Sequence, residues 1–143
     1  MKLRGLVVVA YSPLTFSPSS HKVYQVYQEM KFTRFEDIIA WKKSEELAIL
    51  VYKLFKDCRD YGFKDQIQRA CISVSNNIAE GYERMSNREF RNFLSIAKGS
   101  AGEVRSMLSI AHKLGYIDLN SFQNLNFLAI EISKILSGLI KTL

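Results

Sequence analysis

Hydrophobic residues recur every three or four positions along most of the chain, which is the spacing of amphipathic α-helices. Polar and glycine residues divide this pattern into four segments. We expect helices over about residues 33–57, 64–80 and 86–114, and from about residue 120 to near the C-terminus. No segment alternates hydrophobic and polar residues long enough to favour a strand. The short connections make neighbouring helices antiparallel, so the expected fold class is all-α, an up-down-up-down four-helix bundle.

Short local motifs indicate where these helices begin and end. Three helix starts are expected at polar pairs of capping-box form: Thr33 with Glu36, Ser86 with Glu89, and Asn120 with Gln123. Three glycines, which readily adopt the left-handed conformation that ends many helices, fall at the expected junctions: Gly62, Gly81 and Gly115. The local motifs therefore agree with the division into four helices.

The first 29 residues differ from the rest of the chain. They contain both prolines, Pro13 and Pro18, and show no sustained periodicity. We expect residues 1–29 to be an extension or a poorly ordered tail, with Met30 as a candidate true start, and residues 30–143 to form the bundle domain. A short apolar run after Lys2 and Arg4 resembles a secretory signal, but no clear cleavage site follows it, so a cytoplasmic location is favoured.

The third expected helix has distinct faces when each residue is placed about 100° after the last. The hydrophobic face consists of Phe90, Leu94, Ala97, Ala101, Val104, Leu108 and Ala111. A basic row lies beside it: Arg91, Lys98 and Arg105 recur every seven residues, Arg84 continues that spacing backward, and Arg88 lies close by. From Arg88 onward, no member of this row has an acidic residue three or four positions away, the spacing at which ion pairs form on a helix. The row is a candidate nucleic-acid-binding surface, and a solvated charged face is the alternative.

A second set of polar residues lies on the other shoulder of this helix and on the helix before it. It comprises Arg69, Ser73, Asn77, Glu80, Ser100 and Glu103. Because polar groups are costly to bury unless paired, we expect them to form a polar network or an interface, in which Arg69 satisfies Glu103 or Glu80. A ligand or RNA contact is the alternative. Gly99 and Gly102 interrupt the same helix, where close approach of another backbone would compensate their low helix propensity.

Composition narrows the functional classes. Twenty Lys and Arg residues against 14 Asp and Glu give a net charge of +6, which favours acidic partners such as nucleic acid. With only two cysteines and two histidines, neither a disulfide framework nor a zinc site is expected, and we expect no metal or cofactor. No apolar run reaches the ~20 residues of a membrane span. Surplus hydrophobic surface on the first and last helices favours self-association, and a wider core is the alternative.

Several motifs together resemble a known family. They are Phe35-Glu36-Asp37, Trp41-Lys42, Gln66-Ile67-Gln68-Arg69-Ala70, Ser73-Val74-Ser75-Asn76-Asn77-Ile78-Ala79-Glu80-Gly81, Arg84, Phe90, Phe93-Leu94, Ile96-Ala97-Lys98-Gly99-Ser100, Glu103 and Leu114-Gly115-Tyr116. Over residues 30–143 the chain resembles the four-helix bundle family named after 23S rRNA intervening sequences. Members often have a proline between the first two helices, where this chain has Cys58-Arg59-Asp60.

The resemblance implies a bacterial, cytoplasmic protein that forms a ring-like homopentamer and has no catalytic activity. A related bundle is the accessory protein of diversity-generating retroelements, which engages nucleic acid and a reverse transcriptase. We therefore expect a non-enzymatic, self-associating bundle that binds RNA or DNA, or a ribosomal or other nucleoprotein partner, through the basic row. A purely protein-binding scaffold or a reverse-transcriptase accessory subunit is the alternative.

A ribonuclease is the more distant alternative. Arg105 and His112 are separated by six residues, and superficially resemble the Arg-x-His spacing of a helical ribonuclease superfamily. A histidine there could act as general acid or base. However, Ser106 follows Arg105, where those nucleases usually have a more polar or charged residue, and a histidine at the edge of a helical core is usually structural.

Overall fold

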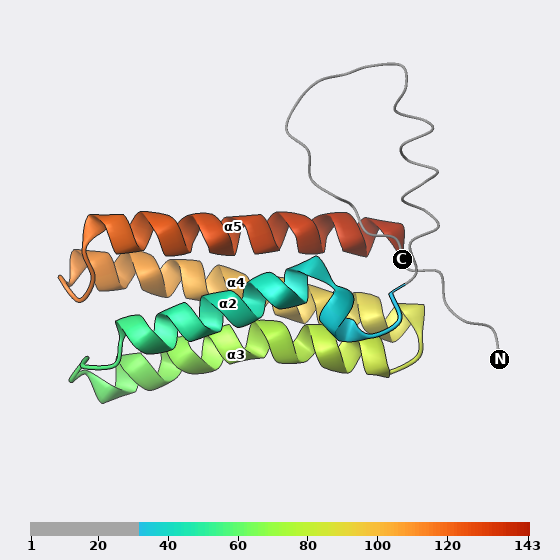
Figure 1. Ribbon diagram of the computed structural model, residues 1–143, viewed down its shortest axis with the longest axis horizontal. Helices are drawn as coiled ribbons and strands as arrows, with labels where there is room; N and C mark the ends of the chain where they lie inside the picture. Colours follow the sequence, from blue (N-terminus) through green and yellow to red (C-terminus); the bar gives the residue numbers. More distant parts are fainter. Residues whose placement is uncertain (1–31) are drawn as a thin grey trace, which may run out of the picture.

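The computed structural model describes residues 32–143, and four helices account for most of them (Figure 1). A short 3-10 turn, η1, spans Phe35–Asp37. The helices are α2 (Ile39–Leu54), α3 (Tyr61–Glu83), α4 (Asn87–Lys113) and α5 (Leu119–Thr142). The described residues contain no strand, and the expected all-α four-helix bundle is confirmed. The predictions for residues 1–29 lie outside the described residues.

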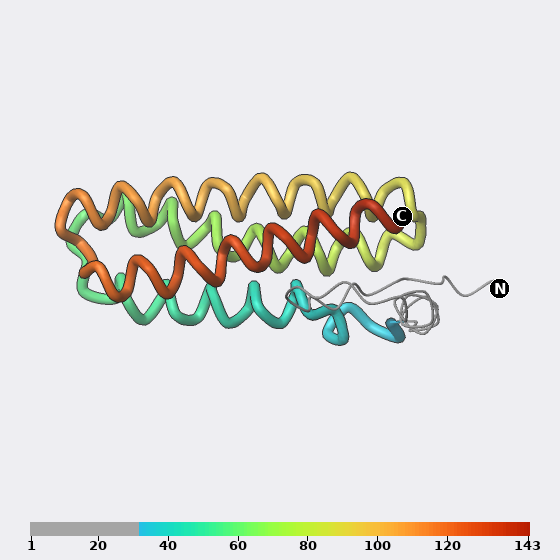
Figure 2. Tube along the Cα trace, turned by 90° about the horizontal axis from the view of Figure 1, so that it is seen from above, coloured from blue at the N-terminus to red at the C-terminus, as the bar shows by residue number. Residues whose placement is uncertain are grey.

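The helices form a square bundle in which each packs against two neighbours (Figure 2). α3 lies between α2 and α4, and α5 closes the square by packing on α4 and α2. Consequently α2 and α4 are diagonally opposed. The core contains one hydrophobic stripe from each helix, and all seven residues expected on the hydrophobic face of the third helix are buried. This burial fixes which sides of α4 remain available to solvent or to a partner.

Two of the expected helix ends are confirmed. The Ser86 hydroxyl accepts a hydrogen bond from the Glu89 backbone N–H and caps α4, with 3.5 Å between the two atoms. Gly115 follows α4 with φ +77°, the left-handed conformation that glycine adopts without strain. α5 begins differently from the expectation: Asp118, rather than Asn120, is its cap, and its Oδ1 accepts from the Ser121 N–H at 2.7 Å. A carboxylate is an equally good cap, which moves the helix start two residues toward the N-terminus.

The expected junction at Gly81 is wrong, because α3 continues to Glu83. Gly81 is buried inside the helix, and a Cβ atom placed on it would lie only 2.5 Å from the Cβ of Phe93 in α4. The glycine therefore permits close helix packing instead of ending the helix. The left-handed residue of the α3–α4 turn is Met85, with φ 61°. Gly62 also lies inside α3, in its first turn, because Asp60 caps this helix upstream of the expected start.

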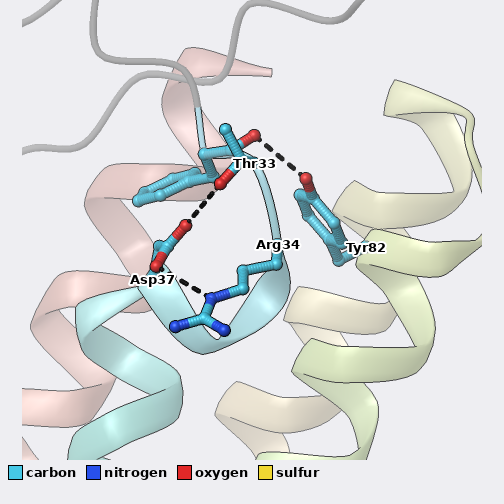
Figure 3. A network of polar contacts seen from close by, with 5 residues as sticks. Thr33, Arg34, Asp37 and Tyr82 are labelled. Carbon is cyan, nitrogen blue, oxygen red and sulfur yellow. Dashed lines mark hydrogen bonds and ion pairs between the residues drawn. The ribbon is translucent and has the colours of Figure 1, made fainter.

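The first helix is shorter than expected at both ends, beginning at Ile39 and ending at Leu54. Thr33 is not a helix cap: its hydroxyl donates to Asp37 Oδ2 at 2.9 Å, while the Arg34 guanidinium donates to Asp37 Oδ1 at 3.4 Å (Figure 3). These two bonds stabilise η1 as a separate turn. The Tyr82 hydroxyl, from α3, donates to the Phe32 backbone carbonyl at 3.0 Å and holds this end of the chain against the bundle.

Candidate nucleic-acid interface

The basic row expected on the third helix lies on the solvent-exposed side of α4. Arg91, Lys98 and Arg105 are all exposed, and α4 runs without interruption past all three, so neighbouring members are separated by about 10.5 Å along the axis. Among residues 32–143, no carboxylate lies within 4.0 Å of these three side chains or of Arg88. The packing of the described helices therefore brings no carboxylate to Arg88, Arg91, Lys98 or Arg105, as expected from the lack of acidic residues three or four positions away.

Arg84 is placed differently from the rest of the row. It is the C-terminal cap residue of α3, and its guanidinium forms an ion pair with Glu80 at 2.7 Å. The hydrogen bond to Glu80 raises the pKa of Arg84, and the same guanidinium lies 5.3 Å from the ring centre of Phe93. The expectation that Arg84 continues the spacing of the α4 row is therefore wrong, because the longer α3 keeps it on another helix.

α5 adds two lysines to the basic surface. An open groove of about 370 Å³ runs between α4 and α5, and its charged lining residues are Arg105, Lys134 and Lys141. The other lining residues are Ile130, Ser133, Ser137 and Gly138. Lys134 and Lys141 are absent from the site residues expected from sequence, although their seven-residue spacing equals that of the α4 row. That shared spacing was the available signal, since antiparallel packing brings two such rows to one groove.

The three acidic residues of α4 and α5 do not line this groove. Glu103 accepts from Gln66 Nε2 of α3 at 3.4 Å, and Glu131 forms an ion pair with Lys43 of α2 at 3.0 Å. Glu89 lies close enough to Arg84, at the α3–α4 turn, to contribute to the raised pKa of that arginine. Within residues 32–143, the groove therefore has cationic and no acidic lining residues, and Glu131 lies in the small neighbouring pocket with Lys134.

Three of the six residues expected in a polar network, Ser73, Asn77 and Ser100, bond to one another between α3 and α4. The Ser73 and Ser100 hydroxyl oxygens lie 2.9 Å apart across the two helices. Asn77 Nδ2 donates to Ser73 twice, to the hydroxyl at 2.9 Å and to the backbone carbonyl at 2.7 Å. Because these side chains are partly buried and paired with one another, they fix the register of α3 against α4.

The expected partners of Arg69 are wrong. Arg69 pairs with Asp65, one turn earlier in α3, at 2.8 Å, and not with Glu103 or Glu80. A partner four residues away on the same helix is closer than one across the seam, and Arg69 remains solvent-exposed. Gln66, which lies seven residues before Ser73 on the same face, takes the place at Glu103 that Arg69 was expected to fill.

A third feature is the hydrophobic shoulder of α4, defined by Ile96 and Ile110 on either side of Glu103. Their side chains are 52% and 46% exposed. Gly99 and Gly102 lie on the nearby outer surface, and no atom of the described chain would come within 4 Å of a Cβ added to either. The expected close approach of another backbone is thus not provided within the described residues.

The expected surplus of apolar surface on the first and last helices is found on only part of them. Leu50 and Leu54 of α2 are exposed, whereas Leu136 of α5 is buried in a wider core.

The two residues of the ribonuclease alternative lie on α4 in different surroundings. Arg105 lines the α4–α5 groove. His112 lies half-buried near the end of α4, where its ring stacks on Phe122 of α5 with 5.2 Å between ring centres. This stack gives His112 a packing role between the two helices.

Comparison with known proteins agrees with this architecture. Residues 36–138 match the family described as 23S rRNA-intervening sequence protein. A crystal structure of a protein with unknown function from the S23 ribosomal protein family of Bacteroides thetaiotaomicron superimposes with a TM-score of 0.68. The two chains are 29% identical, and the match covers 72% of this chain and 99% of that one. No curated protein matches the chain.

Between residues 32 and 143, no helix combines the length and hydrophobicity needed to cross a membrane. The chain belongs to the 23S rRNA-intervening sequence protein family.

Proposed function

We propose that this protein is a non-enzymatic nucleic-acid-binding bundle whose α4–α5 face contacts the phosphate backbone. The observation that carries the proposal is the positive groove in which Arg105 of α4 meets Lys134 and Lys141 of α5. Arg91 and Lys98 extend the same positive surface along α4. Among the described residues, no carboxylate lines the groove itself: Glu103 accepts from Gln66 of α3, and Glu131, in the adjoining pocket, is paired with Lys43 of α2.

The chemistry of the face favours backbone contact over base recognition. Lysine ammonium groups act as point charges on phosphate, and arginine can bind two phosphate oxygens at once. Such contacts release counterions, which makes affinity depend strongly on salt and little on sequence. We therefore expect RNA or DNA to bind with low sequence preference. The family name, and the S23 ribosomal protein family of the similar crystal structure, support a ribosomal or other nucleoprotein setting, which we include in the proposal.

The test is a fluorescence anisotropy titration of labelled RNA and DNA with the wild type and the variant Arg91→Ala/Lys98→Ala/Arg105→Ala. The matched control is Lys42→Ala/Lys53→Ala/Arg59→Ala, which removes the same charge from exposed positions on α2 and the turn that follows it. We expect the first variant to bind at least about tenfold more weakly and the control to bind nearly as the wild type does. Equal binding by all three proteins would contradict the proposal and favour a protein-binding scaffold, such as a reverse-transcriptase accessory subunit.

We also propose that the protein self-associates through the hydrophobic shoulder of α4. The support is the exposure of Ile96 and Ile110 together with the open space over Gly99 and Gly102, which a neighbouring helix could occupy. Exposed apolar residues flanked by polar groups are typical of protein interfaces. The pentameric ring is the assembly that the family resemblance favours, and this shoulder lies on the α3 side of α4, away from the basic groove.

Light scattering measures the mass directly. We expect a multiple of the 16.4 kDa chain mass for the wild type and a smaller mass for Ile96→Glu/Ile110→Glu. The control Ile49→Glu places one glutamate on an exposed isoleucine of α2 and is compared with each single α4 variant, Ile96→Glu and Ile110→Glu. A monomeric wild type, or unchanged mass in the α4 variant, would contradict this part of the proposal.

A further inference from the structure

One aromatic ring is exposed at the end of the basic groove. Phe127 of α5 is 71% exposed, and no other aromatic ring among residues 32–143 contacts it. It lines a small pocket together with Ile130, Glu131, Lys134 and Ile135. Ile130 and Lys134 also line the basic groove, so the two depressions adjoin.

The position of Phe127 follows the spacing of the lysines. Phe127, Lys134 and Lys141 are separated by seven residues each, which places them along one side of α5 at steps of about 10.5 Å. A large apolar ring thus begins a row that two cations continue. The core does not require this ring, since the buried residues of α5 lie on its opposite side.

From this arrangement we infer that the groove takes single-stranded nucleic acid, with one base stacked on Phe127 and the neighbouring phosphates on Lys134 and Arg105. The inference rests on the proposed function and adds the class of strand. In a duplex, the base faces are stacked on one another and are not available to Phe127. In a single strand, any base can offer its face to an aromatic side chain, and such stacking tolerates all sequences.

Charge distinguishes this occupant from a second copy of the chain. Lys134, Lys141 and Arg105 line the groove beside the ring, which complements a polyanion. The one carboxylate that lines the ring's own pocket within residues 32–143, Glu131, is paired with Lys43 of α2 at 3.0 Å. Two copies meeting through this same face would bring like charges together, which is unfavourable. The hydrophobic shoulder of α4 carries no comparable group of cations and suits self-association better.

The test uses oligo(dT) of about 20 nucleotides and a duplex of the same length, titrated with the wild type, Phe127→Ala and Phe127→Trp. The matched control is Tyr61→Ala, which removes a 73% exposed aromatic ring from α3. We expect Phe127→Ala to weaken single-strand binding about 5- to 100-fold and to leave duplex binding within about twofold. Phe127→Trp should restore single-strand binding, and Tyr61→Ala should change neither.

The tryptophan variant supplies a direct readout of stacking. Its added indole should be quenched when oligo(dT) binds, whereas emission from Trp41, which packs edge-on against Phe35, should stay constant in the wild type. Unchanged single-strand binding by Phe127→Ala would overturn the inference and leave the proposed function intact if the α4 triple variant still loses binding. A wild type that binds neither probe would overturn both. A loss of mass for Phe127→Ala in light scattering would assign the ring to an interface and also overturn the inference.

Discussion

Tyr116, which follows α4, donates its phenol hydrogen to the Oδ2 of Asp60, the residue that caps α3, at 2.9 Å. The other oxygen of the same carboxylate, Oδ1, accepts from the Phe63 backbone N–H at 3.1 Å. The Tyr116 ring packs edge-on against Phe63, with 5.4 Å between ring centres. One carboxylate therefore joins the α2–α3 turn to the α4–α5 turn at this end of the bundle.

Replacing Asp60 tests this junction. Asp60→Ala removes the helix cap and should lower the free energy of unfolding by about 1 kcal/mol or more, measured by urea denaturation. Asp60→Asn retains an oxygen that can accept from the Phe63 N–H, so it should lose much less. Equal losses for the two variants, or none for either, would contradict the capping role.

Asp118 provides a pH-dependent test at the start of α5. Its hydrogen bonds from Ser121 favour the ionised carboxylate and hold the pKa of Asp118 below its usual value. A lowered folded-state pKa means that the cap contributes stability above the unfolded pKa, near 4, and loses it as the pH falls further. We expect the wild type to lose stability relative to Asp118→Asn below about pH 4, by urea midpoints across the acid range, because asparagine caps without titrating. A constant difference between the two proteins at every pH would contradict this account.

Two glycines should respond oppositely to alanine. Gly81→Ala places a methyl group against Phe93 and should lower the free energy of unfolding by about 1–3 kcal/mol. In the dissociated chain, Gly99→Ala meets open space and should raise the free energy of unfolding by up to about 1 kcal/mol, because alanine favours helix. Denaturation at low protein concentration checks both, and Gly102→Ala serves as a second open position. Destabilisation of the Gly99 variant accompanied by loss of mass would place another chain against this surface.

The features predicted correctly from sequence depend on local interactions. The hydrophobic face of α4 and the Ser86 cap follow from periodicity and from residues within one turn, and both are confirmed. The Gly81 junction is wrong because a contact with Phe93 in the next helix, invisible in the sequence around Gly81, explains that glycine.

In the candidate site, too, residues on one helix could be predicted from sequence, whereas contacts between helices could not. Arg91, Lys98 and Arg105 could be grouped from sequence because all three lie on one helix. Lys134 shares the seven-residue spacing of the α4 row, but the packing of α5 on α4 is what brings Lys134 and Phe127 to that surface. The expected ion-pair partner of Arg69 is wrong because the choice between Asp65 and Glu103 depends on side-chain distances between α3 and α4.

The most direct test of nucleic-acid binding by the α4–α5 face is the slope of log affinity against log salt concentration. Each phosphate contact contributes about 0.7–0.9 to this slope, through counterion release. We predict a steep slope for the wild type and a decrease of about 2–3 for Arg91→Ala/Lys98→Ala/Arg105→Ala, with no change for Lys42→Ala/Lys53→Ala/Arg59→Ala. Equal slopes for all three proteins would contradict the assignment of this face to phosphate binding.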